Sequence, residues 1–255
     1  MLMRLITIPM SHYCEKARWG LIHADLEHVE DAHLQGLHYL AVRGLGSGGL
    51  VPVLMTADGP ISDSSKILQW IDRRLPPSLK LYPAAHEDTV RRWEQDFDAQ
   101  LGVETRRWIY FHWFQRSNRE IVAISGQKTP AFQRLVGPAL FPMARRVITR
   151  KFGISAENVR QGLPVIDQAF DRVEKQLSDG RPFLFGDQFT AADLCFACLA
   201  APVLLPRQYG IRLPTLDEAP ASARADIQRY SAHPAGKFAL HLFEQHRQPA
   251  TRTGS

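Results

Sequence analysis

Residues 51–67 constrain the fold most, because a strand entered through a proline is followed closely by the start of a helix. The run Val51-Pro52-Val53-Leu54 predicts a strand whose first residues lie at a sheet edge, since proline cannot donate to a ladder. Asp58-Gly59 then predicts a turn into a second short strand. The next helix opens with Asp63-Ser64-Ser65, residue types that cap free amides. The pattern predicts a strand edge beside an exposed helix end.

Such an edge is suited to binding a small acidic peptide. An X-Pro bond is the only linkage in which a cis peptide costs little, so the backbone of Val51 can turn outward and pair with a peptide ligand. The amides of Ser64 and Ser65, at the positive end of their helix, can bind a carboxylate. The plainer alternative, an ordinary edge strand and an ordinary helix cap, fits each half of the pattern taken alone.

The chain changes character near residue 76. Before it, predicted strands and helices alternate, whereas after about residue 87 apolar residues recur at helical steps of three and four, as in 163–177. Three prolines within residues 76–83 cannot continue a helix and indicate a linker. We therefore predict an α/β domain at 1–76, a linker at 77–87, an all-α domain at 88–246 and a flexible tail at 247–255.

Thr190 and Asp193 supply a second local signal. They stand three residues apart directly before an apolar run, which predicts a capping box in which aspartate replaces the usual glutamate. We assign this pair a structural role as a helix N-cap.

These segments, in this order, resemble the glutathione transferase family. An apolar strand at 2–8, a helix opened by Ser11-His12-Tyr13-Cys14, the proline strand and the acidic helix start carry the resemblance in the first 75 residues. The loop before Thr190 and its capping box extend it to about 157–205. The resemblance, to cytosolic serine-type and bacterial-like members, implies a thioredoxin-like α/β domain followed by an all-helical bundle domain. It also implies glutathione as co-substrate and a twofold homodimer.

The resemblance also implies a set of site residues. The proline would be cis and would present the preceding backbone to the cysteinyl part of glutathione, while the acid-serine pair would hold its γ-glutamyl end. The glutathione-binding residues implied in this sequence are Tyr13, Leu50, Val51, Pro52, Asp63 and Ser64. Asp63 is shorter than the commoner glutamate, and Leu50 stands where a polar residue often helps, after the flexible glycine-rich loop 44–49. We therefore expect weak or altered glutathione affinity as one outcome.

Ser11 is the predicted catalytic residue. A free thiol with a pKa of about 8.5 is only about 3% ionised at pH 7, so a protein that uses glutathione must stabilise the thiolate. A hydroxyl at a helix N-terminus can donate a hydrogen bond to the sulfur while the helix dipole acts on the same charge. Cys14 is the alternative, because Ser11 and Cys14 have the spacing of a C-x-x-C motif whose first cysteine is serine.

The second substrate is expected on the helical side of the site. Residues 108–114 form the densest aromatic run, and some of its members can line an apolar cleft while others face the core. We assign Trp108 and Phe111 to an electrophile pocket, with core packing or dimer contact as the alternative for either residue. An apolar electrophile fits such a pocket better than a sugar or nucleotide; its identity is not encoded here.

Composition excludes several other classes of protein. No apolar run approaches the roughly 18 residues of a membrane span, so we expect a cytoplasmic protein with no membrane partner. The formal net charge is +5, and the basic doublets, Arg106-Arg107 among them, carry no nucleic-acid motif, so we expect no nucleic acid. Cys195 and Cys198 lie one turn apart in an apolar helix and lack a second ligand pair, so we expect no metal.

Three questions stay open at this level. The family also offers lyase, dehalogenase and thiol-disulfide reductase chemistry, the last favoured if Cys14 is exposed. A transferase-like binding protein without turnover is the alternative outside enzymes. Residues 115–155, interrupted by glycines and prolines, have no assigned role.

Overall fold

The computed structural model describes residues 2–247, so the predicted tail lies almost wholly outside the described residues. The N-terminal part is a four-stranded sheet with the order β2-β1-β3-β4. Strand β1 (Met3–Thr7) pairs in parallel with β2 (His28–Ala32) and antiparallel with β3 (Val53–Thr56), which pairs antiparallel with β4 (Gly59–Ser62). Leu5 and Leu54 face each other in this register and are fully buried.

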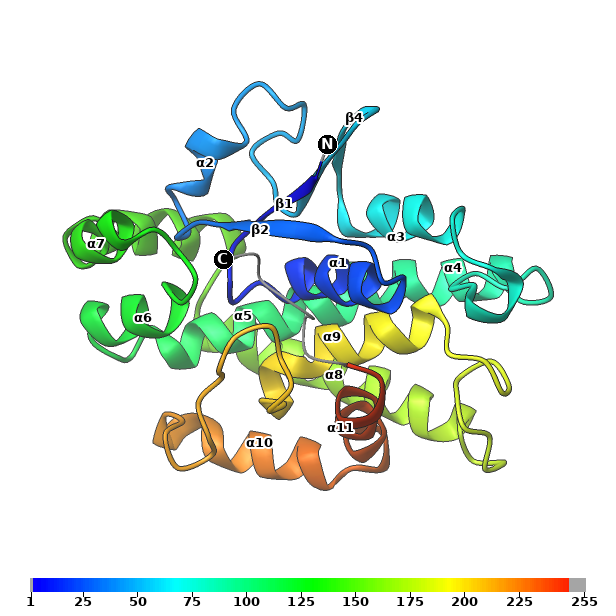
Figure 1. The fold of residues 1–255 in the computed structure, drawn as a ribbon. Coiled ribbons are helices and arrows are strands. Elements are labelled where there is room, and N and C mark those ends of the chain that lie inside the picture. The colour runs from blue at the N-terminus through cyan, green and yellow to red at the C-terminus, as the bar shows by residue number, and fades with distance from the viewer. Residues whose placement is uncertain (1, 248–255) are drawn as a thin grey trace.

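Two helices cover one face of this sheet (Figure 1). Helix α1 (His12–His23) and helix α3 (Ser64–Asp72) pack against each other, and a Cβ on Gly20 would lie 2.3 Å from a methyl of Leu68. Glycine at this position lets the helices approach closely without displacing Leu68. A short helix, α2 (His38–Ala41), lies before the loop that leads to β3.

The rest of the chain is helical. Asp72, at the end of α3, accepts hydrogen bonds from the backbone N–H of Leu81 and Tyr82 and fixes the proline-rich crossing to the second part. The elements that follow are η1 (Pro77–Leu79), α4 (Glu87–Asp96), the π-helical turn η2 (Phe97–Leu101), α5 (Gly102–Trp113), α6 (Asn118–Ser125), α7 (Ala131–Phe152), α8 (Ala156–Gln176), α9 (Ala191–Leu204), α10 (Ala221–Ala232) and α11 (Pro234–His246).

Helix α9 is the centre of the helical part. Every one of its residues is buried, because it packs on α1 of the first part as well as on α4, α5, α10 and α11. Its N-terminus is a capping box in which the Asp193 carboxylate accepts hydrogen bonds from the backbone N–H and hydroxyl of Thr190, at 2.9 and 2.6 Å. The predicted fold class, a thioredoxin-like α/β domain followed by an all-helical domain, is confirmed. No described helix is long and apolar enough to cross a membrane.

Residues 115–155, to which the sequence assigned no role, contain the helices α6 and α7, which pack against each other at the left of Figure 1. Helix α7 continues through Pro138 and Pro142 instead of being interrupted there. Pro142 is exposed and Pro138 partly so, which lets water satisfy the carbonyls that lose their helical partners. The pair has its own small core, made by Leu34, Phe114, Ile121, Val122, Phe141 and Ile148.

Candidate active site

Three chain segments meet at one end of the sheet. Because β3 is antiparallel to both neighbours, the end of β1, the start of β3 and the end of β4 lie at the same edge. These three ends lead respectively to Ser11, to Pro52 and to Asp63. The topology therefore brings together residues that are more than 50 positions apart in sequence.

The peptide bond between Val51 and Pro52 is cis. Within the described residues, neither the N–H nor the C=O of Val51 has a hydrogen-bond partner, whereas the next carbonyl, that of Pro52, accepts from Asp63. Val51 thus presents one unpaired donor and one unpaired acceptor just before β3 begins. This is the geometry that an extended peptide needs to add to a sheet.

Asp63 caps α3 from a strained conformation. Its φ of 84° lies in the left-handed region, which costs a non-glycine residue about 1–3 kcal/mol. One carboxylate oxygen accepts hydrogen bonds from the N–H of Ser65 and of Lys66, at 2.9 and 3.2 Å. These bonds, with the bond from the Asp63 N–H to the Pro52 carbonyl, hold the helix N-terminus and its positive end at the sheet edge.

The two serines that follow differ in their hydrogen bonding. Ser64 is 3% exposed. Within residues 2–247, neither its N–H nor its hydroxyl makes a hydrogen bond. Ser65 instead donates its hydroxyl to Asp98 at 2.8 Å and accepts from the fully buried Lys16. Ser64 is therefore free to bind a ligand, while Ser65 belongs to a polar network between the two parts of the chain.

Ser11 is the N-cap of α1 and is partly exposed. Its backbone N–H donates to Ile8 at 3.0 Å, which closes a tight turn after β1. Its hydroxyl oxygen accepts a hydrogen bond from the N–H of Cys14 at 3.3 Å and leaves the hydroxyl proton available to another acceptor. A negatively charged atom beside this hydroxyl would also be stabilised by the helix dipole.

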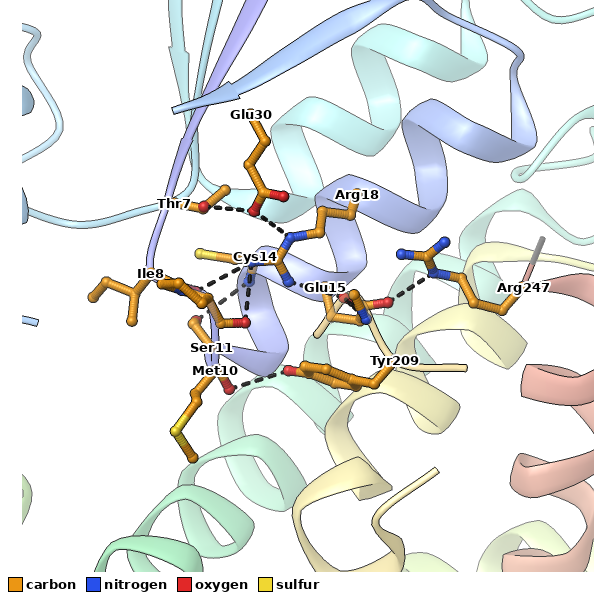
Figure 2. Close-up of polar contacts among 12 residues, drawn as sticks. Thr7, Ile8, Met10, Ser11, Cys14, Glu15, Arg18, Glu30, Tyr209 and Arg247 are labelled. Atoms are coloured by element: carbon orange, nitrogen blue, oxygen red, sulfur yellow. Dashed lines mark hydrogen bonds and ion pairs between the residues drawn. The ribbon is translucent and has the colours of Figure 1, made fainter. Parts of the chain in front are cut away.

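A buried ion network holds the loop that carries Ser11 (Figure 2). The guanidinium of Arg18 donates to the carbonyls of Ile8 and Pro9, at 3.3 and 3.1 Å. From the helical part, the hydroxyl of Tyr209 donates to the carbonyl of Met10 at 3.1 Å. The loop is thus fixed from two sides by side chains that are almost fully buried.

Two carboxylates hold Arg18 in turn. Glu15 and Glu30 accept from it at 2.9 and 2.5 Å, and Glu15 also accepts from Arg247 at 2.7 Å. The Arg18 charge, acting against burial, holds the pKa of Glu30 down at about 2. No pattern in the sequence predicted this network. The available signal was the charged segment Glu15-Lys16-Ala17-Arg18, which is followed directly by the largely apolar residues 19–22 of the same helix.

Cys14 has no exposed surface, and burial raises the pKa of its thiol. Cys195 and Cys198 are equally buried. A buried neutral thiol is a poor nucleophile. Among the described residues, the one group with the spacing of a metal site is Asp171, Glu174 and His233, of which the two acids are exposed on α8, far along the chain from this edge.

Ser11 opens into a large apolar cavity of about 470 Å³. Of the predicted ligand residues, Tyr13, Leu50 and Val51 also line it, whereas Pro52, Asp63 and Ser64 lie outside its wall. Much of the remaining wall comes from α2, α5 and α7, including Tyr39, Ile109, Tyr110, Trp113, Phe141 and Phe152, and α6, α9 and residues 205–213 also contribute. The hydroxyl of Tyr13 donates to the carbonyl of Asp98 and so fixes the ring in the wall.

Helix α5 contributes to the cavity through a different face from the one expected. Trp108 is 1% exposed and donates its indole N–H to Asp226 in α10, at 2.8 Å, on the side of the main core. Phe111 also packs against that core. Neither of the two lines the cavity, and Ile109, Tyr110 and Trp113 of the same aromatic run do.

The wall of the cavity carries basic side chains and no carboxylate. Arg106 and Lys151 line it, and no Asp or Glu does. The Arg106 guanidinium lies 4.2 Å from the ring centre of Phe152, and within the described residues it has no hydrogen bond or ion pair. His12 is neutral, because burial lowers its pKa to about 3. In the sequence, Arg106 is noted only as part of a basic doublet without a nucleic-acid motif.

Comparison with known protein families finds two matches. Residues 5–78 match the glutathione S-transferase N-terminal domain, and residues 156–225 match the glutathione S-transferase C-terminal domain. Together they span more than half of the chain and leave α6 and α7 outside. No curated protein matches the sequence.

Solved structures share the whole fold. A glutathione S-transferase from Methylobacterium radiotolerans, in complex with glutathione sulfonate, is 20% identical with a TM-score of 0.55, over 100% of this chain and 98% of that one. One from Ceriporiopsis subvermispora, in complex with glutathione, is 15% identical with a TM-score of 0.64, over 98% and 100%. One from Phanerochaete chrysosporium is 14% identical with a TM-score of 0.65, over 99% of each chain.

Proposed function

Because this chain belongs to the glutathione S-transferase family, we propose that it adds the thiolate of glutathione to an apolar electrophile. The observation that carries the proposal is the combination at one sheet edge of unpaired donors with a serine that opens into an apolar cavity. The solved relatives from Methylobacterium radiotolerans and Ceriporiopsis subvermispora bind glutathione sulfonate and glutathione, which supports the same ligand here.

Glutathione binds in extended form along this edge. The unpaired N–H and C=O of Val51 pair with the cysteinyl backbone, after the cis bond to Pro52. The γ-glutamyl carboxylate accepts hydrogen bonds from the free N–H and hydroxyl of Ser64 at the positive end of α3. This leaves the thiol directed toward Ser11, where β1 ends.

Ser11 is the proposed catalytic residue. Its hydroxyl donates a hydrogen bond to the sulfur, and the dipole of α1 adds to the stabilisation, so the thiol loses its proton to solvent near neutral pH. The thiolate then forms a bond to the electrophilic carbon, and a leaving group, where the substrate has one, departs with its electron pair. The burial of Cys14 supports Ser11 over the cysteine and over thiol-disulfide chemistry.

The second substrate occupies the cavity next to Ser11. Its aromatic and aliphatic wall suits an apolar molecule, and the unpaired guanidinium of Arg106 suits one that carries an acidic group or develops negative charge. We also expect a homodimer in the cytoplasm, as the family resemblance implies.

Ser11→Ala tests the proposed chemistry. Conjugation at pH 7 should fall by about one to two orders of magnitude, because one preorganised donor is lost. The ultraviolet absorbance of the bound thiolate should appear at higher pH, while calorimetry should find glutathione affinity nearly unchanged.

Cys14→Ala is the matched control, since Cys14 lies one helical turn from Ser11 and has no exposed surface. It should leave the conjugation rate within about twofold of the wild type. Loss of turnover in Cys14→Ala, together with a mixed disulfide between glutathione and the wild type, would instead assign a thiol-transfer reaction. A wild type that binds glutathione but conjugates no electrophile in a broad panel would make the chain a binding protein.

A further inference from the structure

Exposed apolar side chains gather in two segments beside the cavity. In the described part of the chain, twelve large apolar side chains are substantially exposed, and nine of them belong to α7 or to residues 39–50. These nine are Tyr39, Leu40, Leu50, Phe132, Leu135, Val136, Leu140, Met143 and Val147. Single exposed apolar residues are normal on a protein, whereas a cluster of this kind marks an interaction surface.

Helix α7 is apolar on two faces. Its inner face packs into the small core through Phe141 and Ile148. On the outer face, Phe132, Val136, Leu140, Met143 and Val147 follow one another at steps of four, four, three and four, which places them on one stripe of the helix. Leu140, Met143 and Val147 of this stripe also line the cavity, and all five side chains remain substantially exposed.

The same two parts of the chain carry basic residues without acidic ones. Residues 32–57 and 121–156 contain no Asp or Glu, but they contain seven Lys and Arg. The remainder has 24 Lys and Arg against 26 Asp and Glu, so all of the positive net charge of the chain comes from these two segments. On α7, three arginines, Arg145, Arg146 and Arg150, line a second hollow next to the apolar stripe.

The two segments form one surface around the opening of the cavity. The Lys151 ammonium donates to the hydroxyl of Tyr39 at 3.4 Å and so joins α7 to α2. Leu50, Met143 and Val147 are more than half exposed and also line the cavity, which makes them its rim. We call residues 39–50 and 132–151 the α2–α7 face; both helices lie at the left of Figure 1.

We propose that the α2–α7 face docks on the surface of an anionic phospholipid bilayer. The apolar stripe enters the boundary between headgroups and acyl chains, and the basic side chains around it pair with phosphate and other anionic headgroups. Such a peripheral contact needs no spanning helix. Under the function proposed above, the rim of the cavity then meets the lipid, and an apolar electrophile passes from the bilayer into the cavity without crossing water.

The charge on this face argues against a second copy of the chain as the occupant. A twofold contact would pair the face with itself and bring two sets of Lys and Arg together, with no carboxylate from either segment to neutralise them. An anionic lipid surface supplies the opposite charge over the whole face.

Vesicle sedimentation of the full-length protein tests the proposal without using catalysis. The wild type should bind vesicles of phosphatidylglycerol and phosphatidylcholine, bind pure phosphatidylcholine vesicles weakly, and dissociate as salt is raised. Phe132→Gln with Leu135→Gln, and separately Arg146→Glu with Arg150→Glu, should each weaken binding about tenfold or more. None of these four residues lines the large cavity.

The matched control is Arg207→Glu with Lys237→Glu, which makes the same change in net charge at exposed positions outside the face. It should weaken binding less than threefold. Equal weakening in the control and the Arg146/Arg150 variant would overturn the proposal, because net charge alone would then explain binding. A wild type that binds no vesicle would also overturn it, and if Phe132→Gln with Leu135→Gln then converted a dimer into monomers in sedimentation, the face would be assigned to a second copy.

Discussion

The two sides of the proposed active site are held by different forces. On the thiol side, buried charges fix the backbone: Arg18 and Tyr209 hold the loop that carries Ser11, and Glu15 and Glu30 hold Arg18. On the acceptor side, α7 is held mainly by a small apolar core and by Gly137, where a Cβ would lie within 3 Å of Leu34 and of Val122. Charged networks impose exact distances, whereas apolar packing tolerates exchange of side chains of similar volume. We therefore expect the thiol side to tolerate few substitutions and the acceptor side to tolerate more.

Arg18→Met should break the thiol side. It leaves Glu15 and Glu30 as buried carboxylates with lost partners and removes two bonds to the Ser11 loop, so the free energy of unfolding should fall by about 3–5 kcal/mol. Denaturant titration measures this. Arg160→Met, which breaks an exposed pair with Glu157 on α8, is the control and should change stability by less than about 0.5 kcal/mol. Similar losses of unfolding free energy in the two variants would show that the buried network does not stabilise the fold.

Acid should weaken the same network. The pKa of Glu30 is held at about 2 in the folded chain and is 4.5 in the unfolded chain. Its contribution to stability is therefore complete above pH 4.5 and is lost as the pH falls toward 2. Relative to Glu30→Gln, the wild type should lose about 3 kcal/mol of unfolding free energy across that range. Parallel pH profiles for the two proteins would contradict the assignment.

Ser64→Ala and Ser65→Ala should show which of the two serines binds glutathione. One charge-assisted hydrogen bond to glutathione is lost while the backbone amide remains, so calorimetry should find binding weaker by about 1–2 kcal/mol. Ser65→Ala should weaken glutathione binding less, since its hydroxyl already donates to Asp98. The reverse order would move the carboxylate from Ser64 to Ser65.

Arg106→Met should affect the choice of electrophile only. Loss of its unpaired charge should reduce kcat/KM for an acid-bearing apolar electrophile about tenfold relative to its uncharged ester, while the rate with the ester changes little. Arg107→Met is the matched control, because the neighbouring guanidinium pairs with Glu104 and does not line the cavity. An unchanged ratio between acid and ester would remove Arg106 from substrate recognition.

Local patterns gave the elements but not the contacts between them. Prolines, caps and apolar spacing are short-range signals. They were sufficient for an α/β part followed by a helical part and for the cap at Thr190 and Asp193, but not for α6 and α7. Residues 108–114 are aromatic on nearly every side, so their sequence has no polar face to indicate which members turn toward the cavity. Tertiary packing against α10 decides that Trp108 turns inward. Likewise, Arg106 and Arg107 look alike in sequence, and only Glu104 and Phe152 distinguish them.

The contact between Arg247 and Glu15 has a consequence for synthesis of the chain. These residues are 232 positions apart, so the carboxylate beside the Ser11 loop receives this partner only after residue 247 has left the ribosome. Trp19 makes a similar contact, donating its indole N–H to the carbonyl of His246. A nascent chain that has made only its first domain therefore has the serine and its Arg18 contacts but lacks Tyr209 and Arg247. The full support of the Ser11 loop therefore forms only after α11 has left the ribosome.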